Sequence, residues 1–147
     1  MTNEEFITWA GRYITPKVLQ ERYKITAIAV SEKQLADAMA AISEAYFAPV
    51  YSGVEYSDEL EMSTGLQLSV AAFVFAYVSM YTLTATKYAT AKGTHEGSTI
   101  PTSTDVSAQV SKYRRIGVMY LVGANEFKAA GLTLKTWRYS PILGEEL

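Results

Sequence analysis

The longest hydrophobic pattern in the chain lies near its middle and predicts a helix. No residue from Met62 to Thr86 carries a charge, and apolar residues recur there in steps of four and three. A stripe of small residues and a third, apolar stripe run beside the first, so the helix is apolar on nearly all sides. The three stripes are Leu66, Val70, Phe73, Tyr77 and Met80; Gly65, Ser69, Ala72, Ala76 and Ser79; and Leu68, Ala71, Phe75 and Val78.

A helix of this kind must be surrounded, either by protein or by lipid. Its stripe of small residues allows a second helix to approach closely. The run is long enough to cross a bilayer, which takes about 20 apolar residues, but it contains Gln67 and many Ser and Thr, and no strong basic cluster fixes an orientation. We therefore predict a helix packed within a bundle. The alternative is a small single-pass membrane protein with residues 62–86 as its span.

Two short helices are predicted near the N-terminus. Thr2 or Asn3 can cap a helix over Glu4–Tyr13. A second helix covers residues 16–22 and opens with a proline, which is well tolerated in a first turn. Residues 25–30 are apolar and partly β-branched, and they predict either a loop or a short extended segment.

A third helix is predicted to start at residues 31–34, Ser-Glu-Lys-Gln, which form a capping box. We expect Pro49 to end it. Ser57, with three acids among residues 58–61, is then expected to open the long uncharged helix. Acids in a first turn complement the helix dipole, and we prefer this interpretation to a carboxylate cluster for a cation.

The segment after the uncharged helix is rich in Gly, Thr and Ser. Gly93 and Gly97 bracket Thr-His-Glu, and residues 90–104 are therefore predicted to form a β-hairpin-like loop or an exposed arm. A last long helix follows, with apolar and small residues at heptad spacing. Its stripe consists of Val106, Val110, Tyr113, Gly117, Tyr120, Ala124 and Phe127.

Gly131 is a natural stop for this last helix. The alternation over Leu132–Trp137 predicts a short strand or an extended arm. The predicted fold is mainly α: a helical bundle around one long apolar helix, with a β-hairpin-like loop and an extended C-terminal arm. We divide the chain into a helical domain, residues 1–131, and a C-terminal arm, residues 132–147.

Composition narrows the function classes. The absence of cysteine excludes a disulfide framework and thiol chemistry and fits a reducing cytoplasm. The first residues have neither the positive charge nor the apolar run of a signal peptide. Residues 1–61 hold ten acids and five bases, and residues 62–147 hold eight bases and five acids. This modest asymmetry could favour head-to-tail contacts and is no nucleic-acid signature.

Motifs for catalysis are missing from the sequence. His95 is the single histidine; it lies in the Gly-rich loop, and His95-Glu96 lacks the second histidine of a zinc-protease helix. We interpret it as solvated, with contact to a neighbouring subunit as the alternative, which would make assembly pH-sensitive. Neither a phosphate-binding glycine pattern nor a nucleophile elbow is present. The chain is therefore predicted not to be an enzyme and to need no cofactor or metal.

Two groups of residues are candidates for contacts with other molecules. Lys112, Arg114 and Arg115 form a basic cluster that is either a solvated helix face or a contact to an acidic partner or DNA. The segment 137–139, Trp-Arg-Tyr, has the residue types that dominate binding energy at interfaces. That segment either reaches a partner or folds back on its own core.

Four segments in this order resemble one protein family. They are Tyr13–Arg22 with its Ile-Thr-Pro, the helix Val30–Tyr46 ending in Phe-Ala-Pro at residues 47–49, the long apolar helix, and the loop Lys92–Val106 leading into Tyr113-Arg-Arg. Their order and spacing resemble the small head-to-tail connector proteins (neck or adaptor) of tailed bacteriophages, especially those of Bacteroidota phages including crAss-like ones. The resemblance covers residues 13–128. The tail Trp137–Leu147 has no counterpart, and the long helix is less acidic and richer in Ser and Thr than the family pattern.

This resemblance implies an α-helical virion protein that is made in the bacterial host cytoplasm and assembles into a ring of twelve copies below the portal, at the capsid vertex. The ring would extend the DNA channel, bind the portal protein and dock the next neck or tail component, with no membrane involved. The basic cluster would face the channel or an acidic neighbour. The predicted subunit and portal contacts are Lys92, Gly93, Thr94, His95, Glu96, Gly97, Trp137, Arg138 and Tyr139. A generic helical scaffold with another partner is a further hypothesis.

Overall fold

A computed structural model describes residues 1–23, 31–93 and 103–138 of the chain. Every element in these ranges is helical, which confirms the predicted mainly α fold. The elements are α1 (Asn3–Gly11), α2 (Pro16–Tyr23), α3 (Glu32–Ile42), the π-helical turn η1 (Ser43–Phe47), α4 (Ala48–Tyr51), α5 (Thr64–Gly93), α6 (Ser103–Gly123), α7 (Asn125–Ala129) and α8 (Leu134–Arg138). The central part of the predicted β-hairpin, residues 94–102, lies outside the described residues, and helices α5 and α6 occupy both of its ends.

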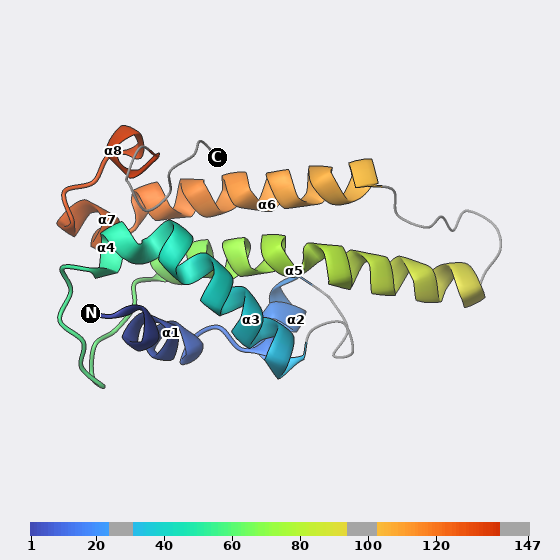
Figure 1. The fold of residues 1–147 in the computed structure, drawn as a ribbon, viewed down its shortest axis with the longest axis horizontal. Coiled ribbons are helices and arrows are strands. Elements are labelled where there is room, and N and C mark those ends of the chain that lie inside the picture. Colours follow the sequence, from blue (N-terminus) through green and yellow to red (C-terminus); the bar gives the residue numbers. More distant parts are fainter. Residues whose placement is uncertain (24–30, 94–102, 139–147) are drawn as a thin grey trace.

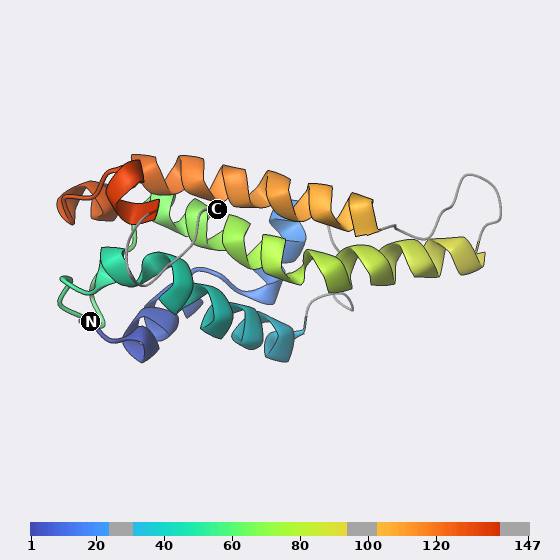
Figure 2. The same cartoon turned by 45° about the horizontal axis from the view of Figure 1, so that its top comes forward.

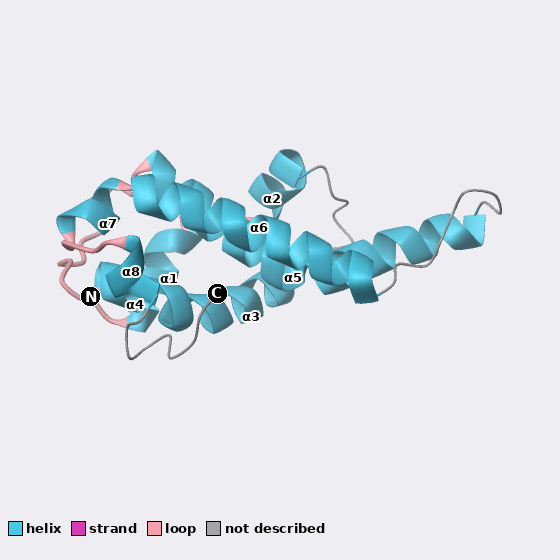
Figure 3. Cartoon of the chain, turned by 90° about the horizontal axis from the view of Figure 1, so that it is seen from above, coloured by secondary structure: helices cyan, strands magenta, loops and turns pink. Residues whose placement is uncertain are grey.

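The long helix α5 is the axis of the molecule (Figure 1). Helix α6 runs antiparallel to α5, and the two helices form a hairpin. They lie side by side in both Figure 1 and Figure 2. Helices α1 to α4 cover the first half of α5, while α7 and α8 close the end where α5 begins. The second half of α5 continues past this body (Figure 3).

The core of the body is aromatic. Phe6 of α1 stacks on Phe47 and on Tyr51, with ring centroids 5.4 and 4.8 Å apart. Phe73 of α5 meets Phe47 edge-on at 5.6 Å and stacks on Tyr46 at 4.5 Å. Such pairs contribute about 0.5–1.5 kcal/mol each beyond the apolar area that they bury. They join α1, the η1–α4 segment and α5 into one core.

The uncharged helix is enclosed on all three predicted stripes in the body. Leu66, Val70 and Phe73 are buried, as is the small stripe from Ser69 to Ser79. The predicted burial of the first stripe is wrong at Tyr77. This side chain is 46% exposed, because it faces an open cleft beside α3.

Small residues of α5 bring α6 close, as predicted. The hydroxyl of Ser69 donates a 2.7 Å hydrogen bond to the carbonyl of Gly117. A Cβ added at Gly117 would lie 2.8 Å from the ring of Phe73, and one at Gly65 would lie 3.2 Å from the Cα of Ala124. Glycine at these two positions therefore sets the distance between the helices.

The capping box predicted at residues 31–34 is present, and of the two candidate caps for the first helix Thr2 is the N-cap, which also forms a capping box. Thr2 pairs with Glu5 at the start of α1, and Ser31 pairs with Gln34 at the start of α3. The predicted end at Pro49 is wrong, because the chain passes through the π-helical turn η1 and then forms α4. Pro49 lies in the first turn of α4, where its missing N–H is tolerated.

The predicted start of the long helix at Ser57 is also wrong. Helix α5 begins at Thr64 and has no acid in its first turn. The Arg12 guanidinium donates to the carbonyls of Asp58 and Leu60, and the Trp9 indole also donates to Leu60 at 3.0 Å. These side chains of α1 bind carbonyl groups that a helix over residues 57–63 would need for its own hydrogen bonds.

The C-terminal helices differ from the sequence prediction in register and type. Tyr120 is 41% exposed, and Leu121 is buried in its place. A straight helix drifts by about 20° per heptad from a strict seven-residue repeat, which accounts for the shift. The prediction that the last long helix runs to Gly131 is wrong, because α6 ends at Gly123 and the chain is extended at Ala124. Gly131, with a φ of +72°, follows the short helix α7 instead. The strand or extended arm predicted over Leu132–Trp137 is wrong, since Leu134–Arg138 is helical.

Candidate functional site

The predicted contact residues lie in different parts of the molecule. Lys92 and Gly93 belong to the last turn of α5, far from the body. Residues 94–97, including His95, and also Tyr139 lie outside the described residues. Among the described contact residues, Lys92 and Gly93 lie at the far end of α5, whereas Trp137 and Arg138 lie in α8 at the opposite end of the molecule (Figure 1).

Trp137 is part of the core. Its side chain is completely buried, its indole Nε1 donates a 2.7 Å hydrogen bond to the carbonyl of Tyr46, and the two rings lie 6.5 Å apart. The segment 137–139 was predicted either to reach a partner or to fold back on its own core, and Trp137 folds back on the core. Its ring is enclosed by its own chain, so it is not free for the partner contact that was predicted.

The basic cluster lies on the outer face of α6. Lys112, Arg114 and Arg115 are all exposed, and the Lys112 ammonium lies 5.4 Å from the centre of the Tyr113 ring. That spacing permits a cation–π contact. The two arginines differ from the lysine, because they border a groove that continues toward α8.

We call this hollow the α6–α8 groove. It has a volume of about 530 Å³, and its lining combines two guanidinium groups with an apolar floor. Met119 is 73% exposed and Leu134 is 40% exposed, which is unusual for side chains of this size. The lining residues are Ser111, Arg114, Arg115, Val118, Met119, Leu134 and Trp137.

Sequence reasoning did not identify the apolar part of the α6–α8 groove. Val118 and Met119 follow Arg115 at steps of three and four, so all three share one face of α6. This spacing could have indicated an apolar surface next to the basic cluster. Leu134 gave none, because it joins the groove only through the helical conformation and docking of α8.

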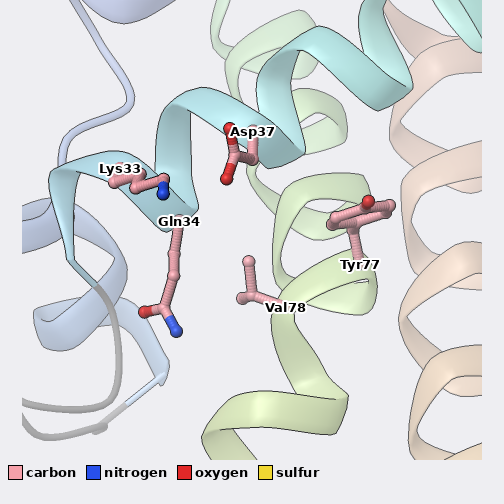
Figure 4. Close-up of a pocket in the computed structure, with 5 residues that line it drawn as sticks. All are labelled: Lys33, Gln34, Asp37, Tyr77 and Val78. Atoms are coloured by element: carbon pink, nitrogen blue, oxygen red, sulfur yellow. The ribbon is translucent and has the colours of Figure 1, made fainter.

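A smaller cleft of about 290 Å³ lies between α3 and α5 (Figure 4). Lys33, Gln34 and Asp37 line it from α3, and Tyr77 and Val78 line it from α5. The figure shows the amide and the carboxylate on the α3 side and the phenol of Tyr77 on the other. These groups can bind a polar surface by hydrogen bonds, but the five residues include no nucleophile paired with a base.

The hydroxyl pKa is raised for two tyrosines in the body, Tyr23 and Tyr51. Burial raises the pKa of Tyr23 to about 12, against a smaller opposing effect of the Arg22 charge. Burial and the nearby Glu44 carboxylate raise the pKa of Tyr51. Both hydroxyls therefore stay protonated near neutral pH, and the Tyr51 hydroxyl donates to Asn3 Oδ1 at 3.3 Å within the fold.

The described part of the chain has neither a candidate metal site nor a candidate membrane span. Among those residues, no three His, Cys, Asp or Glu side chains lie close enough together to hold a metal ion. Within the same ranges, no helix combines the length and the hydropathy that a membrane span requires.

Comparison with known proteins adds no relative. No protein-family model matches the sequence, and it has no significant match among curated proteins or solved structures.

Proposed function

We propose that this chain is a structural virion protein: a head-to-tail connector (neck or adaptor) subunit of a tailed bacteriophage. Copies of it form a ring below the portal at the capsid vertex, extend the DNA channel and dock the next neck or tail component. The proposal rests on the order of sequence segments that resembles this family and on a helical fold with a projecting hairpin. It includes assembly in the bacterial host cytoplasm and a homo-oligomer, with twelve copies as the expected number.

The projecting half of α5 carries the proposal. At 1.5 Å per residue, the segment from Ser79 to Gly93 is about 20 Å long. It extends past helices α1 to α4 and past the start of α6 (Figures 1 and 3). Its sequence has no charge as far as Thr86. An uncharged helix with one neighbouring helix leaves sides that another protein can cover, and adjacent subunits of a ring would supply that cover.

The distribution of charge also suits contacts between unlike ends of neighbouring copies. Residues 1–61 have an excess of acids, and residues 62–147 have an excess of bases. Opposite charges steer association and fix its register. In the proposed ring, Lys112, Arg114 and Arg115 face either the DNA channel or the acidic half of a neighbour, and the segment from Lys92 to Gly97 reaches a neighbouring subunit or the portal.

The first experiment measures assembly. We expect the purified chain to form oligomers that grow with concentration in light scattering and that appear as rings in electron micrographs. It should also form a complex with the portal protein encoded in the same genome. A chain that stays monomeric at the highest concentration and does not bind the portal would contradict the proposal.

A pair of variants makes the test specific for the projecting helix. Leu83→Lys places a charge in the uncharged segment and should reduce oligomer formation. The matched control Ala108→Lys places the same charge at an exposed position of α6 and should not. Circular dichroism checks that both variants remain helical. Carbonate extraction of expressing cells addresses the membrane alternative, because retention of the chain in the pellet would favour a span over residues 62–86.

A further inference from the structure

The α6–α8 groove opens beside the point where the described chain ends. Trp137 lines the groove, and Arg138 is the last residue of α8. Nine residues follow, Tyr-Ser-Pro-Ile-Leu-Gly-Glu-Glu-Leu. Any occupant of the groove therefore competes with a peptide that is covalently attached at its edge.

The groove has an apolar end and a basic end. Leu134 and Met119 form the apolar end next to α8. Arg115 and Arg114 lie one helical turn further along α6, toward its N-terminus. Ser111 closes the groove beyond them. A complementary peptide that enters from α8 must therefore present apolar side chains first and negative charge afterwards.

The C-terminal residues have this order. Pro141, Ile142 and Leu143 come first, and Glu145 and Glu146 follow after one glycine. The apolar residues can cover the floor at Met119 and Leu134, and the two carboxylates match the two guanidinium groups in number and sign. Carboxylate–guanidinium pairs are among the strongest charge-assisted hydrogen bonds in proteins.

We propose that the α6–α8 groove is a binding site for residues 140–147 of the same chain. Ile142 and Leu143 bind the apolar end, and Glu145 and Glu146 pair with Arg114 and Arg115. The inference is argued from the groove and the tail sequence alone. A tail paired with Arg114 and Arg115 would leave Lys112 as the member of the basic cluster that can face the channel or a neighbour in the proposed ring.

Reach and concentration favour the chain's own tail over that of a second copy. The part of α6 from Ser111 to Met119 extends over about 12 Å, whereas nine extended residues span up to about 30 Å. A short flexible linker gives an effective concentration in the millimolar range. At micromolar protein concentration, the attached tail therefore occupies the groove before a tail from another molecule does.

Oxidation of Met119 reports on the groove in the full-length protein. Hydrogen peroxide converts exposed methionine to the sulfoxide, and mass spectrometry locates the product. Met119 is 73% exposed, and a tail bound in the groove would protect it. We expect Glu145→Lys/Glu146→Lys to raise the oxidation rate of Met119 several-fold. Met39 and Met62, which are buried in the core, serve as internal standards and should keep their low rates.

Charge exchange tests the pairing itself. Adding Arg114→Glu/Arg115→Glu to the Glu145→Lys/Glu146→Lys variant should restore the protection of Met119. The control Glu55→Lys/Glu59→Lys makes the same change in net charge at two exposed positions away from the groove and should leave Met119 protected. A second variant, Ile142→Asp/Leu143→Asp, removes the apolar contact and should raise the oxidation rate again.

Three results would overturn the inference. Met119 could oxidise equally fast in the unaltered chain and in every tail variant. The charge exchange could fail to restore protection although the core methionines remain protected. Protection could also depend on protein concentration, which would assign the groove to the tail of a second copy. None of these results bears on ring assembly or portal binding.

Discussion

The indole Nε1 of Trp137 donates a 2.7 Å hydrogen bond to the backbone carbonyl of Tyr46, a residue 91 positions earlier in the chain. Tyr46 lies in the π-helical turn η1, shortly before Pro49, which has no N–H to donate. The side chain of Trp137 therefore satisfies a carbonyl in a segment with an irregular helical hydrogen-bond pattern. The same contact fixes α8 to the body and so forms one wall of the α6–α8 groove.

Replacing Trp137 by Phe should destabilise the protein. The substitution removes the hydrogen bond to Tyr46 and part of a completely buried ring, and we expect a loss of about 2–4 kcal/mol in the free energy of unfolding. Urea denaturation measures the loss. Lys135→Ala, at an exposed position of the same helix, should change the stability by less than about 0.5 kcal/mol. Equal stability of the two variants would show that α8 does not dock as described.

Gly117→Ala should also destabilise the protein, although alanine favours a helix more than glycine does. The added Cβ would lie 2.8 Å from the Phe73 ring, which is buried and cannot move away freely. Overpacking of this kind costs about 1–3 kcal/mol. Gly123→Ala is the matched control, because nothing lies within 4 Å of its added Cβ and the substitution should not destabilise the fold. A stable Gly117→Ala variant would contradict the close packing of α5 on α6.

The prediction of close helix packing was possible because it depends on local periodicity. The stripe of small residues in α5 meets α6 at Ser69 and Gly65, and the capping box at Ser31 was visible within four residues of sequence. Periodicity along one helix does not tell which faces receive neighbours. Tyr77 continues a buried stripe and yet is 46% exposed, because α3 leaves a cleft beside it.

The candidate site was harder to predict because it depends on contacts between distant segments. Arg114 and Arg115 were recognised as a basic cluster, but the groove beside them exists only because α8 folds back through Trp137. The acids of residues 58–61 are close in sequence to the start of α5 and yet do not cap it. Glu126 does so from α7, 63 residues away from Ser63.

Glu126→Ala should destabilise the start of α5. The Glu126 carboxylate accepts a 2.8 Å hydrogen bond from the Ser63 amide and a second bond from its hydroxyl, and its charge complements the helix dipole. We expect a loss of about 1–2 kcal/mol in unfolding free energy. Glu61→Ala removes an acid nearby in sequence and should cost less than about 0.5 kcal/mol. Thermal denaturation distinguishes these outcomes. A larger loss of stability in Glu61→Ala than in Glu126→Ala would show that Glu126 does not cap α5.

The last prediction concerns Tyr23, whose ring stacks on Phe75 at 4.1 Å and meets Tyr113 edge-on at 5.3 Å. Burial disfavours the phenolate and raises the pKa of Tyr23 from 10 to about 12. The folded state therefore binds the phenol proton more tightly than the unfolded state does. The corresponding stability is fully present below pH 10 and is lost as the pH rises from 10 to 12.

Tyr23→Phe removes this pH dependence, because phenylalanine keeps the stacked ring and has no proton to lose. We expect the free energy of unfolding of the unaltered chain to fall, relative to that of the variant, by roughly 1–2 kcal/mol across the window from pH 10 to 12, allowing for the partial exposure of the hydroxyl. Urea denaturation at a series of pH values measures the difference. Tyr77→Phe, at a ring that is 46% exposed, should follow the unaltered chain. Parallel curves for the Tyr23 variant and the unaltered chain would mean that Tyr23 is not buried against Phe75.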